Sequence, residues 1–431
     1  MQPAPPMPAP FAPRQLMPVG VFTPWVLLFA YFILTLPTQW VRAVLPYYGD
    51  VVFGVIMLLV AIPYLFMRSF WRGTSMWAVG LMVYGMIVTY LTRWSEGAWA
   101  FGLREFILDL LLFLAVAFGI KLAEASFESL RTLVSRVSWI CILMGSANIL
   151  LMRFGYVQID ADANSRVVSV SLFYAISPLL FLVPLQVVFR LGTLVSILSV
   201  AMVGLVAYFT LTRSVAIAFF LLLGQLLLHL LRRFMWSFVA GFTVWLILVL
   251  PVLGLGTYFM IDSIASARGM SEIASTSGRD VEFDQFLEQM SPRGWAFGNG
   301  LGTGFSMNGY DPDTGAAAKV LATGLHYSTL TPVLKLGVIL TILIWLSLLY
   351  ASAKIFTTPG DINFKAVIFV PINYLVVYSI SGGWLASAYL VVGIALGILF
   401  NFRAFTETMA AAAQPNLPDG RPLLHRRHRH L

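Results

Sequence analysis

Charged residues are scarce in this sequence. Only 11% of its 431 residues are Asp, Glu, Lys or Arg, whereas 59% are hydrophobic, and the mean hydropathy is +0.86. The apolar residues come in runs close to the ~20 residues that a helix needs to cross a bilayer. This composition excludes a soluble globular protein and predicts a helical membrane protein that crosses the bilayer many times.

Cysteine is almost absent as well. Cys141 is the only one and lies in an apolar run, which excludes a disulfide framework and a thiolate metal site. A reactive thiol is the less favoured interpretation, because a cysteine buried among apolar side chains is usually inert. The first apolar run, near residues 19–36, lacks a small-residue cleavage site, so we interpret it as a retained span.

The sequence predicts an all-α fold, a transmembrane helical bundle of about twelve spans with one long polar loop. These spans divide the chain into a disordered Pro-rich head (1–17), nine transmembrane helices (18–257), the loop (258–328), three transmembrane helices (329–402) and a basic tail (403–431). The expected spans are 18–37, 51–67, 74–92, 105–125, 132–153, 167–189, 192–212, 214–231, 235–257, 329–352, 366–384 and 386–402.

Lys and Arg in the short connections predict the orientation. With a cytoplasmic N-terminus, the inner connections hold ten basic residues and the outer ones six, and the tail adds more to the inside. Both termini are then cytoplasmic, and the long loop faces outward, which in a Gram-negative cell would be into the periplasm. The net charge of +8 does not indicate nucleic acid as a partner, because the basic residues are spread among loop ends.

The long loop contains a predicted amphipathic helix. Ser277 is its expected N-cap, and Pro292 its expected end. Its apolar and polar faces follow helical spacing: apolar Phe283, Phe286, Leu287 and Met290, polar Glu282, Asp284, Gln285 and Glu288. Glycines then alternate at 298, 300, 302 and 304, which predicts either a tight irregular loop or a backbone that closely approaches a ligand.

Three residues are candidates for a functional site on the outer side. Arg213 lies at the outer junction of two spans, where it can snorkel or, beside a helix N-terminus, bind an anion. Arg279 opens the loop helix, where a cation is unfavourable for the helix dipole. His326 is the only histidine on the outer side, and a lone histidine is more often structural than catalytic.

Two arginines and a histidine in one outer cavity would suit a lipid diphosphate substrate. Guanidinium groups pair bidentately with phosphate oxygens and stabilise the charge that grows as a diphosphate leaves. The leaving diphosphate needs no proton, whereas the attacking hydroxyl needs a base, which a neutral imidazole provides. Asp311-Pro-Asp313 is similar to a metal-binding Asp-X-Asp signature, but within NGYDPDTG it is more simply a turn.

The segments around these residues resemble the O-antigen ligase and O-antigen polymerase superfamily of bacterial membrane glycosyltransferases. The resemblance covers roughly 190–345 and rests on a Thr-Arg motif in a span, a loop with Ser-Gly-Arg, an amphipathic helix, a Gly-X-Gly turn and a His-initiated helix with a Leu-Gly pair. The segments are LTRSVAIAFFLLLGQLLL, TSGRDVEFDQFLEQMSPRGWAFGNGLGTGF and LHYSTLTPVLKLGVIL. The sequence departs from the family at Thr-Arg-Ser-Val, where Ser-Arg-Gly is common, and at His326-Tyr327, where His-Asn is common.

The resemblance implies metal-independent, inverting glycosyl transfer with no cofactor at the bacterial inner membrane. Arg213 and Arg279 would bind the diphosphate of an undecaprenyl-linked glycan, with Arg293 and Lys319 as further contacts, and His326 would assist the acceptor hydroxyl. The acceptor would be a saccharide or a lipid-linked glycan. A chain-length regulator or a flippase would be the protein partner, and membrane lipid would surround the spans.

Several functions remain open at this point. VLKLG after His326 resembles polymerase members more than ligases, which favours a polymerase that joins repeat units over a ligase that moves finished glycan onto lipid A-core. A lipid-linked oligosaccharide transporter would be expected to carry charges near the midplane in both halves of an internal repeat. We find no such repeat, and Asp109 is one of few acids inside a span. A structural assembly factor would leave the three candidate residues without a reason to cluster.

Overall fold

The computed structural model describes residues 75–96, 103–123, 127–156, 160–161, 167–168, 172, 175–210, 212–234, 243, 247, 250–267, 277–310, 317–322, 330–357, 362–378 and 386–413. In these ranges the regular elements are helices, apart from two short antiparallel sheets. The elements are α4 (Ser75–Glu96), α5 (Leu103–Leu122), α6 (Phe127–Arg153), β1 (Asp160–Ala161), β2 (Val167–Val168), α8 (Leu179–Val188), α9 (Thr193–Thr210), α10 (Arg213–Phe234), α12 (Leu250–Ala267), α13 (Ser277–Gln289), α14 (Pro292–Phe297), β3 (Phe305–Tyr310), β4 (Ala317–Ala322), α15 (Thr331–Thr357), α16 (Ile362–Lys365), η3 (Ala366–Ile368), α17 (Phe369–Tyr378), α18 (Ala386–Phe400) and α19 (Phe402–Ala413).

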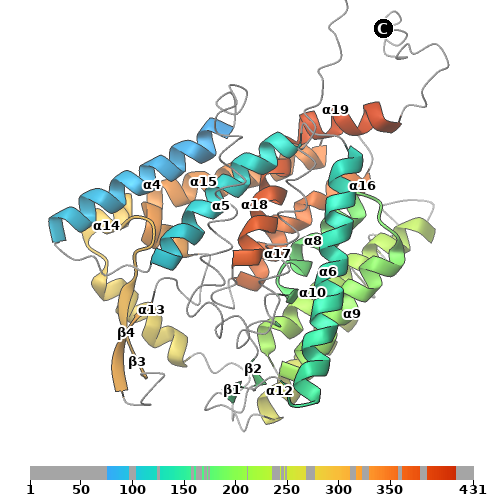
Figure 1. Cartoon of the computed structure of the whole chain (residues 1–431), viewed down its shortest axis with the longest axis horizontal. Helices are drawn as coiled ribbons and strands as arrows, with labels where there is room; N and C mark the ends of the chain where they lie inside the picture. The colour runs from blue at the N-terminus through green and yellow to red at the C-terminus, as the bar shows by residue number, and fades with distance from the viewer. Residues whose placement is uncertain are drawn as a thin grey trace, which may run out of the picture.

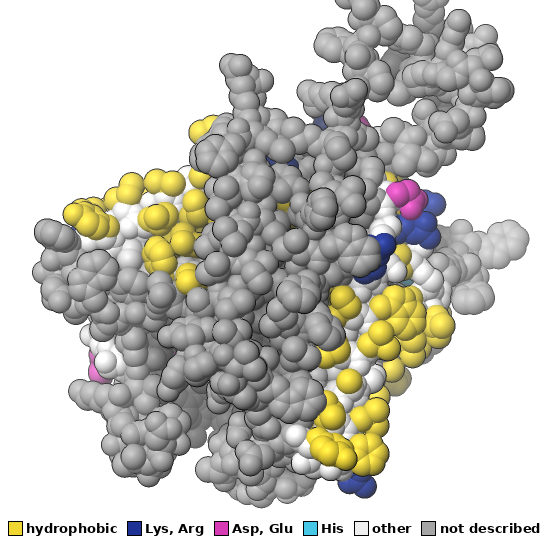
Figure 2. Space-filling view, viewed as in Figure 1, with side chains coloured by type: hydrophobic (Ala, Val, Ile, Leu, Met, Phe, Trp, Pro, Cys, Tyr) yellow, Lys and Arg dark blue, Asp and Glu magenta, His cyan; other side chains and the backbone are white. Residues whose placement is uncertain are grey.

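Four helices among the described residues are long and apolar enough to cross a membrane: Leu130–Arg153, Thr193–Thr210, Arg213–Leu231 and Thr331–Thr357. Their exposed side chains are largely apolar, as expected of a surface in contact with lipid tails. Figure 2 shows such a hydrophobic face running down the right side of the molecule, with charged side chains at its two ends. The fold is therefore that of an all-α membrane protein, as the composition predicts.

Several expected spans differ from the observed helices. The expected spans 18–37 and 51–67 lie outside the described residues. The expected span 167–189 is not one helix, because it contains strand β2 and the ten-residue helix α8, which follows Pro178 and contains Pro184. Pro178, which has no amide proton to donate to an earlier turn, stands at the N-cap of α8, whereas the helix continues through Pro184. Helix α12 runs to Ala267, beyond the expected end at residue 257.

Helix α8 lies in the centre of the bundle, and nine of its ten residues are buried. Its Gln186 amide nitrogen donates to Ser138 Oγ of α6 and to Ser199 Oγ of α9, both at 2.9 Å. On another side, the Asn373 amide of α17 donates at 2.6 Å to the carbonyl of Leu180. Such hydrogen bonds between helices stabilise a membrane bundle, in which apolar contacts alone do not favour helix over lipid.

Helices α5 and α18 pack with their backbones almost in contact. A Cβ atom added at Gly393 would lie 2.4 Å from Ala115 Cβ, and one at Gly397 would lie 2.4 Å from the amide nitrogen of Ile120. A Cβ at Gly119 would lie 2.4 Å from the carbonyl oxygen of Ile394. Later residues of α18 contact later residues of α5, so the two helices run parallel. This is the small-residue packing that allows close contact in membranes.

An aromatic cluster fixes the ends of four elements to one another. The Phe189 ring, just after α8, lies 5.5 Å from that of Phe127 at the start of α6 and 5.6 Å from that of Phe405 in α19. Phe364 of α16 lies 6.3 Å from Phe405. The cluster defines one end of the bundle, to which α19 belongs. Figure 1 shows α19 at the top of the molecule, whereas α12, α13 and the β3–β4 hairpin lie on its lower side.

The packing of α5 on α18 generates a prediction. Gly397→Ala places a methyl group against the α5 backbone, so the free energy of unfolding falls by about 1–3 kcal/mol, as in other overpacked cores. The measurement is reversible unfolding of the purified protein in mixed detergent. Gly80→Ala in α4 is the control, because nothing lies within 4 Å of its added Cβ; equal effects of the two substitutions would contradict the close packing.

Candidate functional site

The polar segment between α12 and α15 folds against the helix bundle through its glycines. Helix α14 begins at Pro292, where Ser291 Oγ accepts from the Gly294 amide at 3.0 Å, and ends at Phe297 with Gly298 as its C-cap. Residues 298–304, the glycine loop, follow. Gly298, Gly300 and Gly302 have φ of 77°, 94° and 70°, which is the left-handed region that side chains other than glycine avoid.

The glycine loop contacts α4 and α5 directly. A Cβ at Gly300 would lie 2.4 Å from Thr89 Oγ1, and one at Gly302 would lie 2.8 Å from Phe106 Cβ. The Leu301 amide donates to Thr89 Oγ1 at 2.6 Å, and the buried Leu301 side chain packs where α4 has Gly85. The close approach that the alternating glycines predict is thus an approach to the protein's own helices, which favours the structural interpretation of this loop.

A buried ion pair lies beneath the loop. Lys335 Nζ of α15 is 3.2 Å from Asp109 Oδ2 of α5, and the two side chains are 5% and 14% exposed. Lys335 Nζ also donates to the Thr303 carbonyl at 2.8 Å, and the Gly302 amide donates to Asp109 Oδ2 at 2.8 Å. Each charge is therefore paired and hydrogen-bonded, which a charge removed from water requires.

Helix α15 breaks where the loop meets it. Gly337 has φ 82° and ψ 168°, and a Cβ there would lie 2.3 Å from the Ala296 carbonyl oxygen. The carbonyls of Leu334 and Lys335 accept from the Asn299 and Gly300 amides at 2.8 and 3.0 Å. The break thus lets the loop backbone bond to the first turns of α15, and a glycine is the expected cause of such a kink.

Helix α13 belongs to the same unit. The Phe286 ring is 5.8 Å from those of both Trp295 and Phe305, and these residues form a cluster with the start of α15. The Gln289 side chain pairs with Ser306 as a strand would, since its amide nitrogen donates to the Ser306 carbonyl at 2.6 Å and its oxygen accepts from the Ser306 amide at 2.8 Å. A helix, a loop and a hairpin are therefore fixed together at one side of the bundle.

The predicted helix in the loop is confirmed, with corrections. Its first residue is Ser277, which was expected as the N-cap, and it ends at Gln289; Pro292 begins the next helix rather than ending this one. Glu282, expected on the polar face, is only 2% exposed, and Leu287, expected on the apolar face, is 38% exposed. Residues 282, 286 and 290 lie one turn apart, so the buried face is centred on them.

The structure describes the predicted site residues to different extents. Arg213 is the first residue of α10 and is half-buried, with its Nε atom inside the protein. Arg293 lies exposed in the first turn of α14. For Arg279 in α13 and Lys319 in β4, the backbone is described and the side chain is not. His326, Asp311 and Asp313 lie outside the described residues, so the meeting of Arg213, Arg279 and His326 stays a prediction.

Sequence reasoning missed two features of this site. The β3–β4 hairpin, in which Asn308 pairs with Lys319, was not predicted. The turn expected at Asp311-Pro-Asp313 could have indicated the hairpin, because a turn between two short runs often joins paired strands. The Asp109–Lys335 pair was also missed, although a lysine within an apolar run requires a partner. Asp109, one of few acids inside an expected span, was the residue to pair with it.

The ion pair generates a double-mutant prediction. Asp109→Asn and Lys335→Met each leave one buried charge without its partner, so each lowers the free energy of unfolding by about 3–5 kcal/mol. The double variant loses less than the sum, because no orphan charge remains. Unfolding in mixed detergent measures all three. Arg403→Ala, which breaks the exposed Arg403–Glu407 pair at 3.0 Å, is the control and has little effect. Additive losses would contradict the pairing.

A second prediction separates strain from steric contact in the loop. Gly155 and Gly300 both have positive φ, but nothing lies within 4 Å of a Cβ added at Gly155. Gly155→Ala therefore costs only backbone strain, on the order of 1–2 kcal/mol. Gly300→Ala adds a clash with the α4 backbone and destabilises more, and limited proteolysis then cuts the 298–304 segment faster. Equal losses from both substitutions would show that the loop does not lie against α4.

Three comparisons with known proteins found no relative of this chain. No protein-family model, no curated protein and no solved structure matches it. The family that the motifs resemble therefore stays a proposal.

Proposed function

We propose that this chain is a bacterial membrane glycosyltransferase that transfers glycan from an undecaprenyl-diphosphate donor to a saccharide acceptor and so polymerises the repeat units of a surface polysaccharide. The observation that carries the proposal is the fold of the polar segment. Helices α13 and α14 and the β3–β4 hairpin form one packed unit on the helix bundle, as a water-exposed catalytic surface requires. The O-antigen ligase and polymerase motifs lie in and beside this unit.

The proposed chemistry is a single displacement. The acceptor hydroxyl oxygen attacks the anomeric carbon of the donor sugar, and the bond from that carbon to the diphosphate oxygen breaks. Undecaprenyl diphosphate leaves as an anion, and His326 takes the proton of the hydroxyl. Arg213 and Arg279 pair with the growing negative charge, with Arg293 and Lys319 as further diphosphate contacts. Attack from the opposite face inverts the anomeric centre.

The fold suits these roles in two ways. Arg279 lies in the first turn of α13, and α13 packs against the start of α15, just after residue 326. The Asp109–Lys335 pair and the glycine loop hold this unit to α4 and α5. A rigid mount of this kind favours catalysis, because misplacement of a reacting group by about 1 Å can cost 10²-fold in rate.

The proposed topology follows the same arrangement. The chain crosses the inner membrane twelve times, with both termini in the cytoplasm and the active site facing the periplasm. The polar unit and α19, which begins the basic tail, lie at opposite sides of the molecule (Figure 1). The parallel direction of α5 and α18 agrees with their places as the fourth and twelfth spans, which both cross in the same direction.

Complementation tests the proposal. The wild type and the Arg213→Ala, Arg279→Ala and His326→Ala variants are expressed at matched membrane levels in hosts that lack their own polymerase or ligase. We expect the wild type to restore a ladder of glycan lengths on a gel. Each variant loses it, because removal of one transition-state contact lowers the rate by about 10²–10³-fold. Addition of a single finished glycan instead of a ladder would identify a ligase.

A matched control and a direct assay sharpen the test. Arg131→Ala removes an exposed arginine of α6, outside the proposed site, and should restore the ladder as the wild type does. With purified protein, release of undecaprenyl diphosphate from a lipid-linked donor should depend on the same three residues. Full activity of all three alanine variants would overturn the site, and movement of the donor across the membrane without its cleavage would support a transporter.

A further inference from the structure

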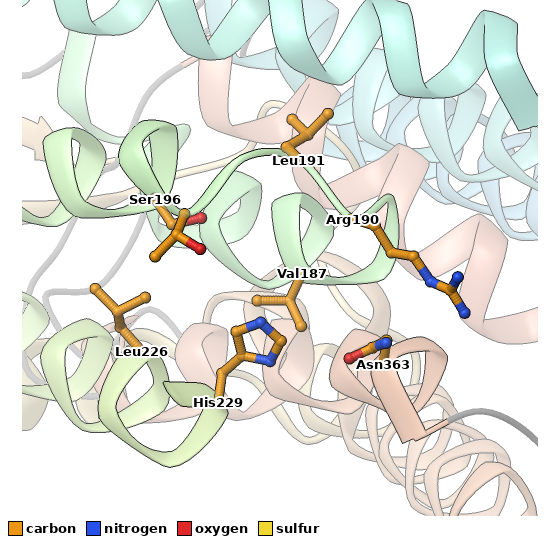
Figure 3. Close-up of a pocket in the computed structure, with 8 residues that line it drawn as sticks. Val187, Arg190, Leu191, Ser196, Leu226, His229 and Asn363 are labelled. Atoms are coloured by element: carbon orange, nitrogen blue, oxygen red, sulfur yellow. The ribbon is translucent and has the colours of Figure 1, made fainter. Parts of the chain in front are cut away.

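A pocket of about 320 Å³ lies between the ends of α8, α9, α10 and α16, next to the aromatic cluster of Phe127, Phe189, Phe364 and Phe405. Arg190, His229, Asn363 and Ser196 form much of its polar lining. Figure 3 shows the His229 imidazole between Leu226 and Asn363, with Arg190 beside Asn363 at the edge of the pocket. No carboxylate is found among the described residues that line it. The lining therefore favours an anion.

The backbone at Arg190 supports a role for its side chain. Arg190 follows the C-cap Phe189 of α8 and has φ 51°, a left-handed conformation. Its amide donates to the Val187 carbonyl at 3.1 Å, and the Leu191 amide donates to the Gln186 carbonyl at 2.9 Å. This is a Schellman motif, whose left-handed residue is usually glycine. The left-handed backbone conformation is unfavourable for arginine, and residues in such conformations are common at functional sites.

The surroundings indicate that the ligand is a lipid. Val187 and Leu226 give the pocket an apolar wall beside its polar groups. On α9, Leu194 and Ile197 directly follow the lining residues Thr193 and Ser196 in the chain. Their side chains are 63% and 44% exposed, as expected of apolar side chains that face lipid tails. A ligand with an anionic head and an apolar chain matches this lining. Basic pockets between transmembrane helices are known to hold phosphate-bearing headgroups.

We propose that this pocket binds the phosphate headgroup of an anionic membrane lipid, with Arg190 and His229 as its anion-binding residues. The guanidinium contacts the phosphate from the edge of the pocket, the imidazole contacts it from within, and the acyl chains follow the exposed face of α9. The site lies at the end of the bundle that carries Arg190, Lys354 and Lys365, and it differs from the proposed catalytic surface. It therefore holds whether or not the chain is a glycosyltransferase.

The test is titration of the purified full-length protein in neutral detergent with phosphatidylglycerol, followed by native mass spectrometry. We expect tighter binding of phosphatidylglycerol than of phosphatidylcholine. Arg190→Gly and His229→Gln should each weaken phosphatidylglycerol binding by about fivefold, the effect of one basic group near a membrane surface. Arg131→Gln is the control, since it removes an exposed arginine that does not line the pocket.

Stability separates this role from a purely structural one. Glycine is the preferred residue at this backbone position, whereas the Arg190 guanidinium lies 5.7 Å from the centre of the Phe364 ring. Arg190→Gly removes both the backbone strain and this contact, so the unfolding midpoint in phosphatidylcholine should change little while lipid binding weakens. Unchanged phosphatidylglycerol binding in both variants, or equal binding of phosphatidylcholine, would overturn the proposal. Competition by inorganic phosphate as strong as that by phosphatidylglycerol would also overturn it, in favour of a soluble phosphate ester.

Discussion

The buried contact between Asp109 and Lys335 joins parts of the chain that are far apart in sequence. It links α5 to α15, and through the Gly302 amide and the Thr303 carbonyl it also holds the glycine loop. Two charges removed from water stabilise the protein only where their hydrogen bonds are complete, so the pair is sensitive to small shifts of any of its neighbours. The positions of α13, α14 and the hairpin depend on this geometry.

Glycine allows this arrangement because it lets backbones meet. At Gly298, Gly300, Gly302 and Gly337 the chain adopts positive φ and lies against another backbone. The same property, without the unusual φ, brings α18 against α5 through Gly393 and Gly397. In both places a methyl group would separate the partners. Glycine thus brings backbones together in both places, and for α5 and α18 this close packing matters because hydrophobic contacts within a membrane give little preference for protein over lipid.

Much of the local structure could be predicted from the sequence, whereas the pairing of distant segments could not. Helix α13 follows from the spacing of Phe283, Phe286 and Met290, and its start follows from Ser277. The Asp109–Lys335 pair could not be predicted, because a single sequence does not say which buried charges meet. The burial of Glu282 was missed for the same reason, since it depends on what packs over that face of the helix.

The parallel contact of α5 with α18 bears on how the protein is made. Helix α5 is made well before α18, which packs closely against it in the folded protein. Until then, the side of α5 around Ala115 and Gly119 has no partner from the C-terminal part. Its small residues offer lipid or another helix an open surface. This part of the bundle can therefore form only after α18 has been made, and chains cut before α18 would leave this face of α5 uncovered in the membrane.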